Sequence, residues 1–177
     1  MACAARHCVF LVPGDPQART GGTLYDRRTV DGLRALGWQV DWLSPGDGFP
    51  WPGAQDVERA AALLEALPDG TLVVADGLAF GALPALAERH AARLRWVALV
   101  HHPLALESGL PSTAQALLQA SERRALACVR QVVVTSPATA HALAAYAVPA
   151  ARIAVVAPGT DPAPAAQGSG AAGLSLL

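Results

Sequence analysis

The chain has 177 residues, enough for one domain with a buried core, and 53% of them are hydrophobic. Its 13 basic and 14 acidic side chains give a net charge of −1, so the chain has no bulk field to attract nucleic acid or anionic lipid. Its basic residues other than histidine are all arginine, and the lack of lysine excludes a P-loop lysine, a Schiff base and a lysine general base.

Cysteine content indicates a reducing compartment. Cys3, Cys8 and Cys128 are odd in number and have apolar neighbours, so we expect buried thiols, no disulfide framework and a cytoplasmic protein. No second Cys/His pair matches Cys3, His7 and Cys8 at zinc spacing, so we predict no metal site. No stretch is long enough to cross a bilayer, which limits any membrane contact to a peripheral one.

Apolar strands alternate with helical patterns along the chain. In chain order we predict a strand over residues 7–12, a helix over 23–36, a strand over 39–43, a helix over 57–67, a strand over 71–75, a helix over 82–91, a strand over 96–100, a helix over 112–127, a strand over 131–135, a helix from 136 to about 146 and a strand over 153–156. This alternation predicts an α/β fold, a Rossmann-like open parallel sheet with helices on both faces.

Local signals place several helix ends. Gly37 stops the first helix, and Pro84 is tolerable only in the first turn of its helix. Ser136 followed by Pro137 is typical of a helix start, with a hydroxyl cap and then proline at the first helical position. Ser136 is therefore a better helix cap than nucleophile, since no G-x-S-x-G motif surrounds it.

Ligands of such sheets bind beyond the carboxyl ends of the strands, so the loop after the first strand is the first candidate. This loop holds Asp15 and Thr20 and ends in Gly21-Gly22 before the helix. The amides of the glycine pair can approach a phosphate closely at the positive end of the helix dipole; the alternative is a flexible turn. The absence of G-x-G-x-x-G argues against a dinucleotide site.

Two further strand ends carry polar side chains. Asp76 follows the third strand and serves either as a base or substrate hydrogen-bond acceptor or, somewhat more in keeping with its position, as the cap of the next helix. His101 and His102 follow the fourth strand, with Glu107 close behind. A histidine here is either a satisfied structural donor or a ligand-binding ring. Glu107 pairs with an arginine, receives an acceptor hydroxyl or is solvated.

Two segments resemble the N-terminal domain of GT-B glycosyltransferases of family 4. They are HHPLALESGL after the fourth strand, and VVVTS with the downstream RIAVVAPGTD. The resemblance covers the chain from the first loop through Asp161. It implies that residues 1–162 are one half of a GT-B fold, and that residues 163–177 are a flexible linker and the start of a C-terminal domain that is absent.

The resemblance implies a retaining transfer of a hexose from a nucleotide diphosphate sugar to an acceptor, with no cofactor beyond that substrate. His101, or its neighbour His102, would face the transferred sugar, and this half would bind the acceptor yet be inactive alone. The candidate donor-phosphate and substrate-binding residues are Asp15, Thr20, Gly21, Gly22, Asp76, Glu107 and Ser136. Arg19, Arg27 and Arg28 would either meet an anionic acceptor or be solvated.

Two other classes of function remain open at this stage. The chain is alternatively a non-catalytic Rossmann-like module that binds a partner chain, or a sugar-nucleotide epimerase of the GT-B fold, which needs acidic catalysts. Any apolar surface left by the absent half would favour self-association.

Overall fold

The computed structural model describes residues 6–165. Cys3 and all but the first three residues of the linker expected at 163–177 lie outside the described residues. Six strands, all paired in parallel, form one sheet within this part of the chain, in the order β2-β1-β3-β4-β5-β6. The strands are β1 (His7–Leu11), β2 (Gln39–Leu43), β3 (Leu72–Asp76), β4 (Arg95–Val100), β5 (Gln131–Val134) and β6 (Ile153–Val155). The predicted Rossmann-like parallel sheet is confirmed.

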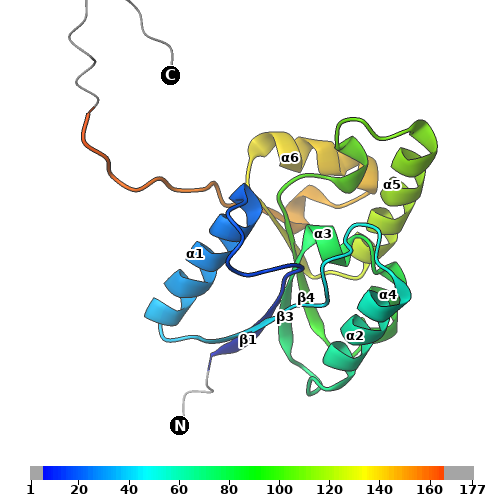
Figure 1. Cartoon of the computed structure of the whole chain (residues 1–177), viewed down its shortest axis with the longest axis horizontal. Coiled ribbons are helices and arrows are strands. Elements are labelled where there is room, and N and C mark those ends of the chain that lie inside the picture. Colours follow the sequence, from blue (N-terminus) through cyan, green and yellow to red (C-terminus); the bar gives the residue numbers. More distant parts are fainter. Residues whose placement is uncertain (1–5, 166–177) are drawn as a thin grey trace, which may run out of the picture.

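Helices cover the two faces of the sheet unequally (Figure 1). The α-helices are α1 (Gly21–Ala35), α2 (Ala54–Glu65), α3 (Gly77–Phe80), α4 (Pro84–His90), α5 (Ser112–Ala127) and α6 (Pro137–Ala142). Three short 3₁₀ helices are η1 (Leu104–Leu106), η2 (Leu143–Tyr146) and η3 (Ala150–Arg152). Helix α1 packs on one face, whereas α2, α4, α5 and η2 pack on the other.

Each face of the sheet has its own apolar core, because strand side chains alternate between the faces. On the α1 face, Cys8, Phe10 and Val12 of the first strand region meet Val30 of α1. The opposite and larger core contains Trp96, whose ring centroid lies 5.1 Å from that of Phe80. The Cys8 thiol is buried, as predicted, whereas the free thiol of Cys128 is only half-buried.

The predicted elements match those of the structure, but several bounds differ. Helix α2 begins at Ala54, three residues before the predicted start, and the helix predicted from 136 to about 146 is divided into α6 and the 3₁₀ helix η2. Helix α1 begins at Gly21, not Thr23, because the Thr20 hydroxyl accepts a hydrogen bond from Thr23 N and caps the helix before the glycine pair. The short elements α3 and η1 were not predicted, since three or four residues carry no helical periodicity. Pro84 is the first residue of α4, where a missing amide proton costs nothing.

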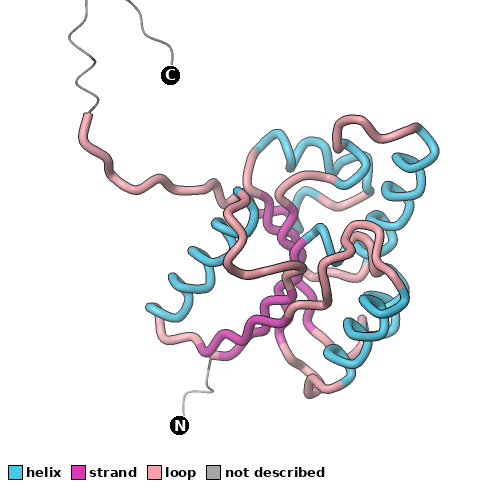
Figure 2. The backbone as a smooth tube through the Cα atoms, in the orientation of Figure 1, coloured by secondary structure: helices cyan, strands magenta, loops and turns pink. Residues whose placement is uncertain are grey.

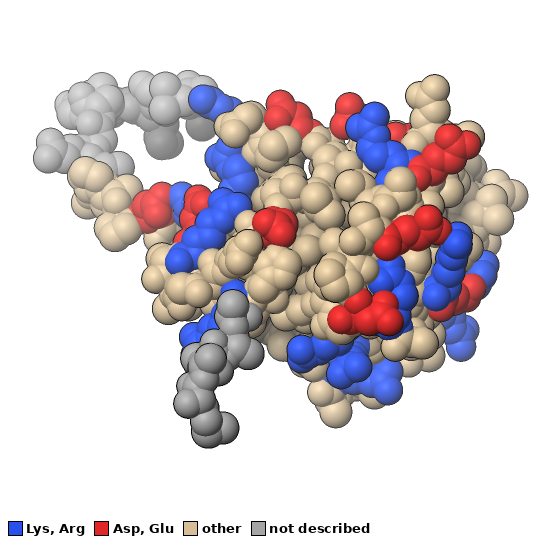
Figure 3. All heavy atoms as spheres, turned by 90° about the horizontal axis from the view of Figure 1, so that it is seen from below, with Lys and Arg blue, Asp and Glu red and all other residues tan. Residues whose placement is uncertain are grey.

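The chain leaves the sheet beside α1. After β6 an extended segment runs past the start of that helix (Figure 2). The Tyr25 hydroxyl donates to the Val156 carbonyl at 2.8 Å, and Arg28 forms an ion pair with Asp161. Acidic and basic side chains are interspersed over the face shown in Figure 3. Among the described residues, no helix has the length and apolar character needed to span a membrane.

Candidate functional site

The site is a cavity at the carboxyl ends of β1, β3 and β4. These strands lie side by side at the centre of the sheet, next to the point where the strand order reverses. The cavity has a volume of about 180 Å³. It is lined by Val12, Pro13, Thr20, Gly22, Thr23, Asp26, Asp76, Leu78, His101, His102, Leu104 and Glu107.

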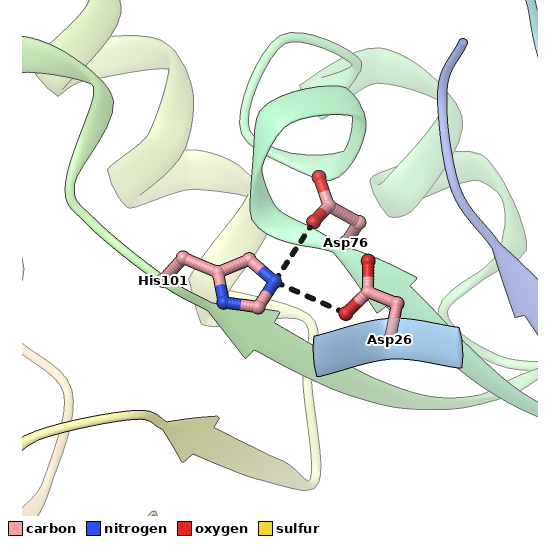
Figure 4. A group of neighbouring side chains, drawn as sticks. All are labelled: Asp26, Asp76 and His101. Carbon is pink, nitrogen blue, oxygen red and sulfur yellow. Dashed lines mark hydrogen bonds and ion pairs between the residues drawn. The ribbon is translucent and has the colours of Figure 1, made fainter. Parts of the chain in front are cut away.

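A histidine whose Nε2 faces two carboxyl groups forms the centre of this cavity (Figure 4). His101 Nε2 lies 3.0 Å from Asp26 Oδ1 and 3.4 Å from Asp76 Oδ2. The three residues come from α1 and from the ends of β3 and β4, so the fold, not local sequence, brings them together. The other ring nitrogen, Nδ1, points away from both carboxyl groups in Figure 4.

The carboxyl groups keep the ring charged. Burial by itself lowers the pKa of His101, but the hydrogen bonds and negative charges of Asp26 and Asp76 outweigh it and raise that pKa to about 9. Burial also raises the pKa of Asp26, against the opposing hydrogen bond from His101 and with a contribution from the charge of Asp76. At neutral pH the site therefore contains an imidazolium that donates from Nε2.

Asp26 is the site residue that sequence reasoning missed. Its side chain is only 1% exposed, although aspartate is rarely buried without a partner. A signal was present: Gly22, Asp26 and Val30 follow one another at four-residue spacing, so a carboxylate interrupts the small and apolar stripe of α1. That stripe packs on the site, where a Cβ atom at Gly22 would lie 3.4 Å from His101 Cδ2.

Contacts from three directions fix the orientation of His101. The Tyr25 ring meets the imidazole edge-on, with centroids 5.3 Å apart and an interplanar angle of 82°. The hydroxyl groups of Thr135 and Thr139 both donate to the His101 carbonyl, at 3.3 and 3.2 Å. The side chain keeps 24% exposure, so the ring is held firmly yet remains open to the cavity.

The sequence-predicted residues divide between the cavity and its surroundings. Asp76 has the predicted capping role, since Oδ1 accepts from Leu78 N at 2.8 Å and caps α3, while Oδ2 faces His101. Its role as a base or as a substrate hydrogen-bond acceptor stays a prediction. Those that also line the cavity are Thr20, Gly22, His101, His102 and Glu107. Of the histidine pair, His101 is the partly buried ring, whereas His102 is exposed.

Three predicted residues lie outside this cavity. Asp15 accepts a hydrogen bond from Gln17 N within the β1–α1 loop. Ser136 accepts from Thr139 N and caps α6, as its sequence context predicted. Gly21 lines a neighbouring cavity of about 420 Å³, which it shares with Tyr25 and Arg28. The glycine pair thus stands between two cavities.

The same three central side chains also have the composition of a metal site. Asp26, Asp76 and His101 each offer one ligand atom, and these atoms lie within 4.8 Å of one another. A protonated Nε2 that donates to carboxylates has no lone pair for a metal, so the imidazolium and a bound cation exclude each other. The absence of a metal requirement stays a prediction.

A second buried carboxyl group supports the loop that follows His101. Glu122 of α5 is 1% exposed, and its Oε2 accepts from Leu104 N at 3.0 Å. Burial raises the pKa of Glu122 to about 7, against the opposing effects of the Leu104 amide, which donates to it, and of the nearby Tyr146 hydroxyl. The raised pKa of Tyr146 comes from burial and from the charge of Glu122.

Comparison with known proteins agrees with this architecture. Residues 53–164 match the model of the family described as Glycosyltransferase Family 4. The chain belongs to glycosyltransferase family 4. The matched region includes Asp76, His101 and Glu107, whereas Gly22 and Asp26 precede it. Among curated proteins, none matches the chain.

Proposed function

We propose that this family 4 chain forms the acceptor-side wall of a retaining glycosyltransferase, which moves a hexose from a nucleotide diphosphate sugar to an acceptor. The observation that carries the proposal is the meeting of Gly22, His101 and Asp76 in one cavity at the carboxyl ends of central parallel strands. Open α/β sheets bind their ligands at this kind of position.

The start of α1 suits the donor diphosphate. Thr20 accepts hydrogen bonds from the amides of Thr23 and Leu24, and among the described residues the amides of Gly21 and Gly22 have no such cap. Free amides at a helix start, together with the helix dipole, favour an anion. They would stabilise the negative charge that grows on the diphosphate as its bond to the sugar breaks.

His101 would add a hydrogen-bond donor on the same side of the reacting bond. Its Nε2 proton is directed at Asp26 and Asp76, which fixes the ring and keeps it charged. The Nδ1 proton is then the one left to donate to an oxygen of the sugar or of the leaving group. In this role His101 binds and orients the donor, and no proton transfer by the ring is needed.

The size of the cavity supports a two-walled site. Complete small-molecule sites typically have about 300 to 1,000 Å³. The cavity here has about 180 Å³, so it would hold part of a substrate pair. We therefore propose that a second α/β domain closes over it and binds most of the nucleotide.

Transfer assays test this proposal. The chain alone, and the chain joined to the donor-binding domain of a family 4 enzyme, are incubated with nucleotide diphosphate hexoses and a panel of acceptors, while nucleoside diphosphate release is followed. We expect release only from the joined protein, with retention at the anomeric carbon of the product as read by NMR. Turnover or tight donor binding by the chain alone would contradict the half-site, and inverted product would contradict the stereochemistry. Epimerised donor in place of a glycoside would favour the epimerase alternative.

A further inference from the structure

The charges that line the main cavity are mostly negative. Asp26, Asp76 and Glu107 contribute three carboxyl groups, and within residues 6–165 the lining contains no arginine. The positive charge of His101 is directed at two of those carboxyl groups, so it is largely compensated before any ligand arrives. Glu107, on the exposed rim, forms no ion pair with the described residues.

The three arginines considered as ligands of an anionic acceptor do not line the His101 cavity. Arg27 donates to the Pro16 carbonyl at 3.4 Å, and Arg28 is paired with Asp161. Arg28 lines the neighbouring cavity that also contains Gly21, and Arg27 lines a third cavity beside α1. Neither arginine lines the cavity that contains His101. Arg19 is exposed and lines none of these cavities. An anion in the His101 cavity would therefore find no arginine to bind it.

An unpartnered buried oxygen gives a second and independent indication. Asp26 is 1% exposed and lines the cavity, and its Oδ2 has no hydrogen-bond partner among the described residues. A buried carboxylate oxygen without a donor is costly, and a ligand hydroxyl is one group that can provide the donor. Carboxylates accept hydrogen bonds from sugar hydroxyls but repel phosphate and carboxylate groups.

We infer that the acceptor bound in this cavity is a neutral, polyhydroxylated molecule whose hydroxyl groups donate to the carboxylates of Asp26, Asp76 and Glu107. This inference rests on the proposed function, because it names the class of acceptor for the same site. It excludes acceptors that bring a phosphate or carboxylate into the cavity. The donor diphosphate would lie on the other side, against the free amides at the start of α1 and the cavity shared by Gly21 and Arg28.

The test measures binding to the full chain by ¹H–¹⁵N NMR. The neutral probes are glucose, galactose, mannose and myo-inositol, which present different hydroxyl patterns; the charged probes are glucose 6-phosphate and glucuronate. We expect at least one neutral probe to shift the amide signals of Gly22, Asp76 and Glu107, and both charged probes to bind at least tenfold more weakly than that neutral probe. Equal or tighter binding of a charged probe would overturn the inference, and so would silence of these signals with all four neutral probes.

One matched pair of variants separates charge from shape. Glu107→Gln removes a rim charge and keeps the size of the side chain, so the preference for the neutral probe over the charged probes should narrow several-fold. Glu58→Gln changes an exposed glutamate of α2 that does not line the cavity, and should leave the preference unchanged. If Glu58→Gln reduced the preference for the neutral probe as much as Glu107→Gln does, the inference would be overturned. Neutral-probe binding without transfer by the joined protein would refute the proposed function and leave the charge preference of the site intact.

Discussion

Two carboxyl groups in this protein are equally buried but have different partners. Asp26 on α1 and Glu122 on α5 are each 1% exposed. Asp26 lies beside His101, a cationic ring, whereas Glu122 has a backbone amide and Tyr146 for neighbours. Burial penalises the charged form of both, and only Asp26 has a positive charge to offset the penalty.

The difference shows how one loop is held in two ways. The segment that begins at His101 is tied to α1 and β3 by an ionic contact at its start, and to α5 by the Leu104 amide three residues later. The contact of His101 with the two carboxyl groups lines the cavity, whereas Glu122, which accepts from the Leu104 amide, is buried outside it. Mutation and pH can distinguish the two contacts, because His101 and Asp26 form a charged pair, whereas burial favours the neutral form of Glu122.

The largest expected effect comes from removing the cation. His101→Ala leaves Asp26 buried without a positive partner, and we expect the free energy of unfolding at pH 6 to fall by about 3 to 5 kcal/mol. Adding Asp26→Asn should recover much of the loss, because the buried group is then neutral. Urea unfolding measures both variants. His102→Ala, which changes the exposed neighbour, should stay within about 0.5 kcal/mol of the wild type.

The pH dependence of this loss gives its own check. The pKa of His101 is raised from 6.5 to about 9 in the folded protein, so the stabilisation by the charged ring is fully present below pH 6.5. It is lost as the pH rises through about 9. The penalty of His101→Ala should therefore shrink between pH 6.5 and 9.5, and a penalty that is constant over this range would contradict the ion pair.

Glu122 should give the next largest effect, in a lower pH range. Its pKa is raised from 4.5 to about 7 on folding, so its stabilising neutral form is fully present below pH 4.5 and is lost as the pH rises through about 7. That shift corresponds to about 3 kcal/mol. Glu122→Gln keeps an acceptor for Leu104 N and cannot ionise, so its stability relative to the wild type should rise by this amount between pH 4 and pH 8.

A thermal or urea unfolding series across that range measures the change. Glu58→Gln is the control, because Glu58 is an exposed glutamate of the same type. A flat difference between Glu122→Gln and the wild type would mean that Glu122 stays ionised in the folded protein.

The smallest effects should come from uncharged hydroxyl groups that cap the helices at the same strand ends. Thr20 and Ser136 each accept a hydrogen bond from the amide three residues on. Replacing either with alanine should lower the free energy of unfolding by about 1 kcal/mol. Because neither hydroxyl titrates, both losses should be the same at pH 5 and pH 9. A loss that depends on pH would show that the cap and the ionic cluster are coupled.

Much of this architecture could be predicted from the sequence, because the strands are short apolar runs between strong turn signals. The strand Gln39–Leu43 and the helix Ser112–Ala127 have the predicted bounds. The start of α1 was placed two residues late, since a Gly-Gly pair is more typical of a loop than of a capped helix start. The four-residue α3 is too short to have a period.

The candidate site was predicted in part. Residues at strand ends, such as Asp76 and His101, could be placed together because parallel strands end at one edge of the sheet. Asp26 could not be placed in the site from the sequence, because it lies inside α1, and the position of that helix relative to the strand ends depends on tertiary packing. The same packing decides which of two adjacent glycines faces His101, and no local pattern distinguishes Gly21 from Gly22.

Adjacent residues of α1 connect two distant parts of the chain. Tyr25 binds the backbone of Val156 through its hydroxyl and touches the imidazole with its ring, while Asp26 binds that imidazole directly. The segment that leaves β6 and the imidazole of the cavity therefore contact neighbouring residues on the same turn of α1.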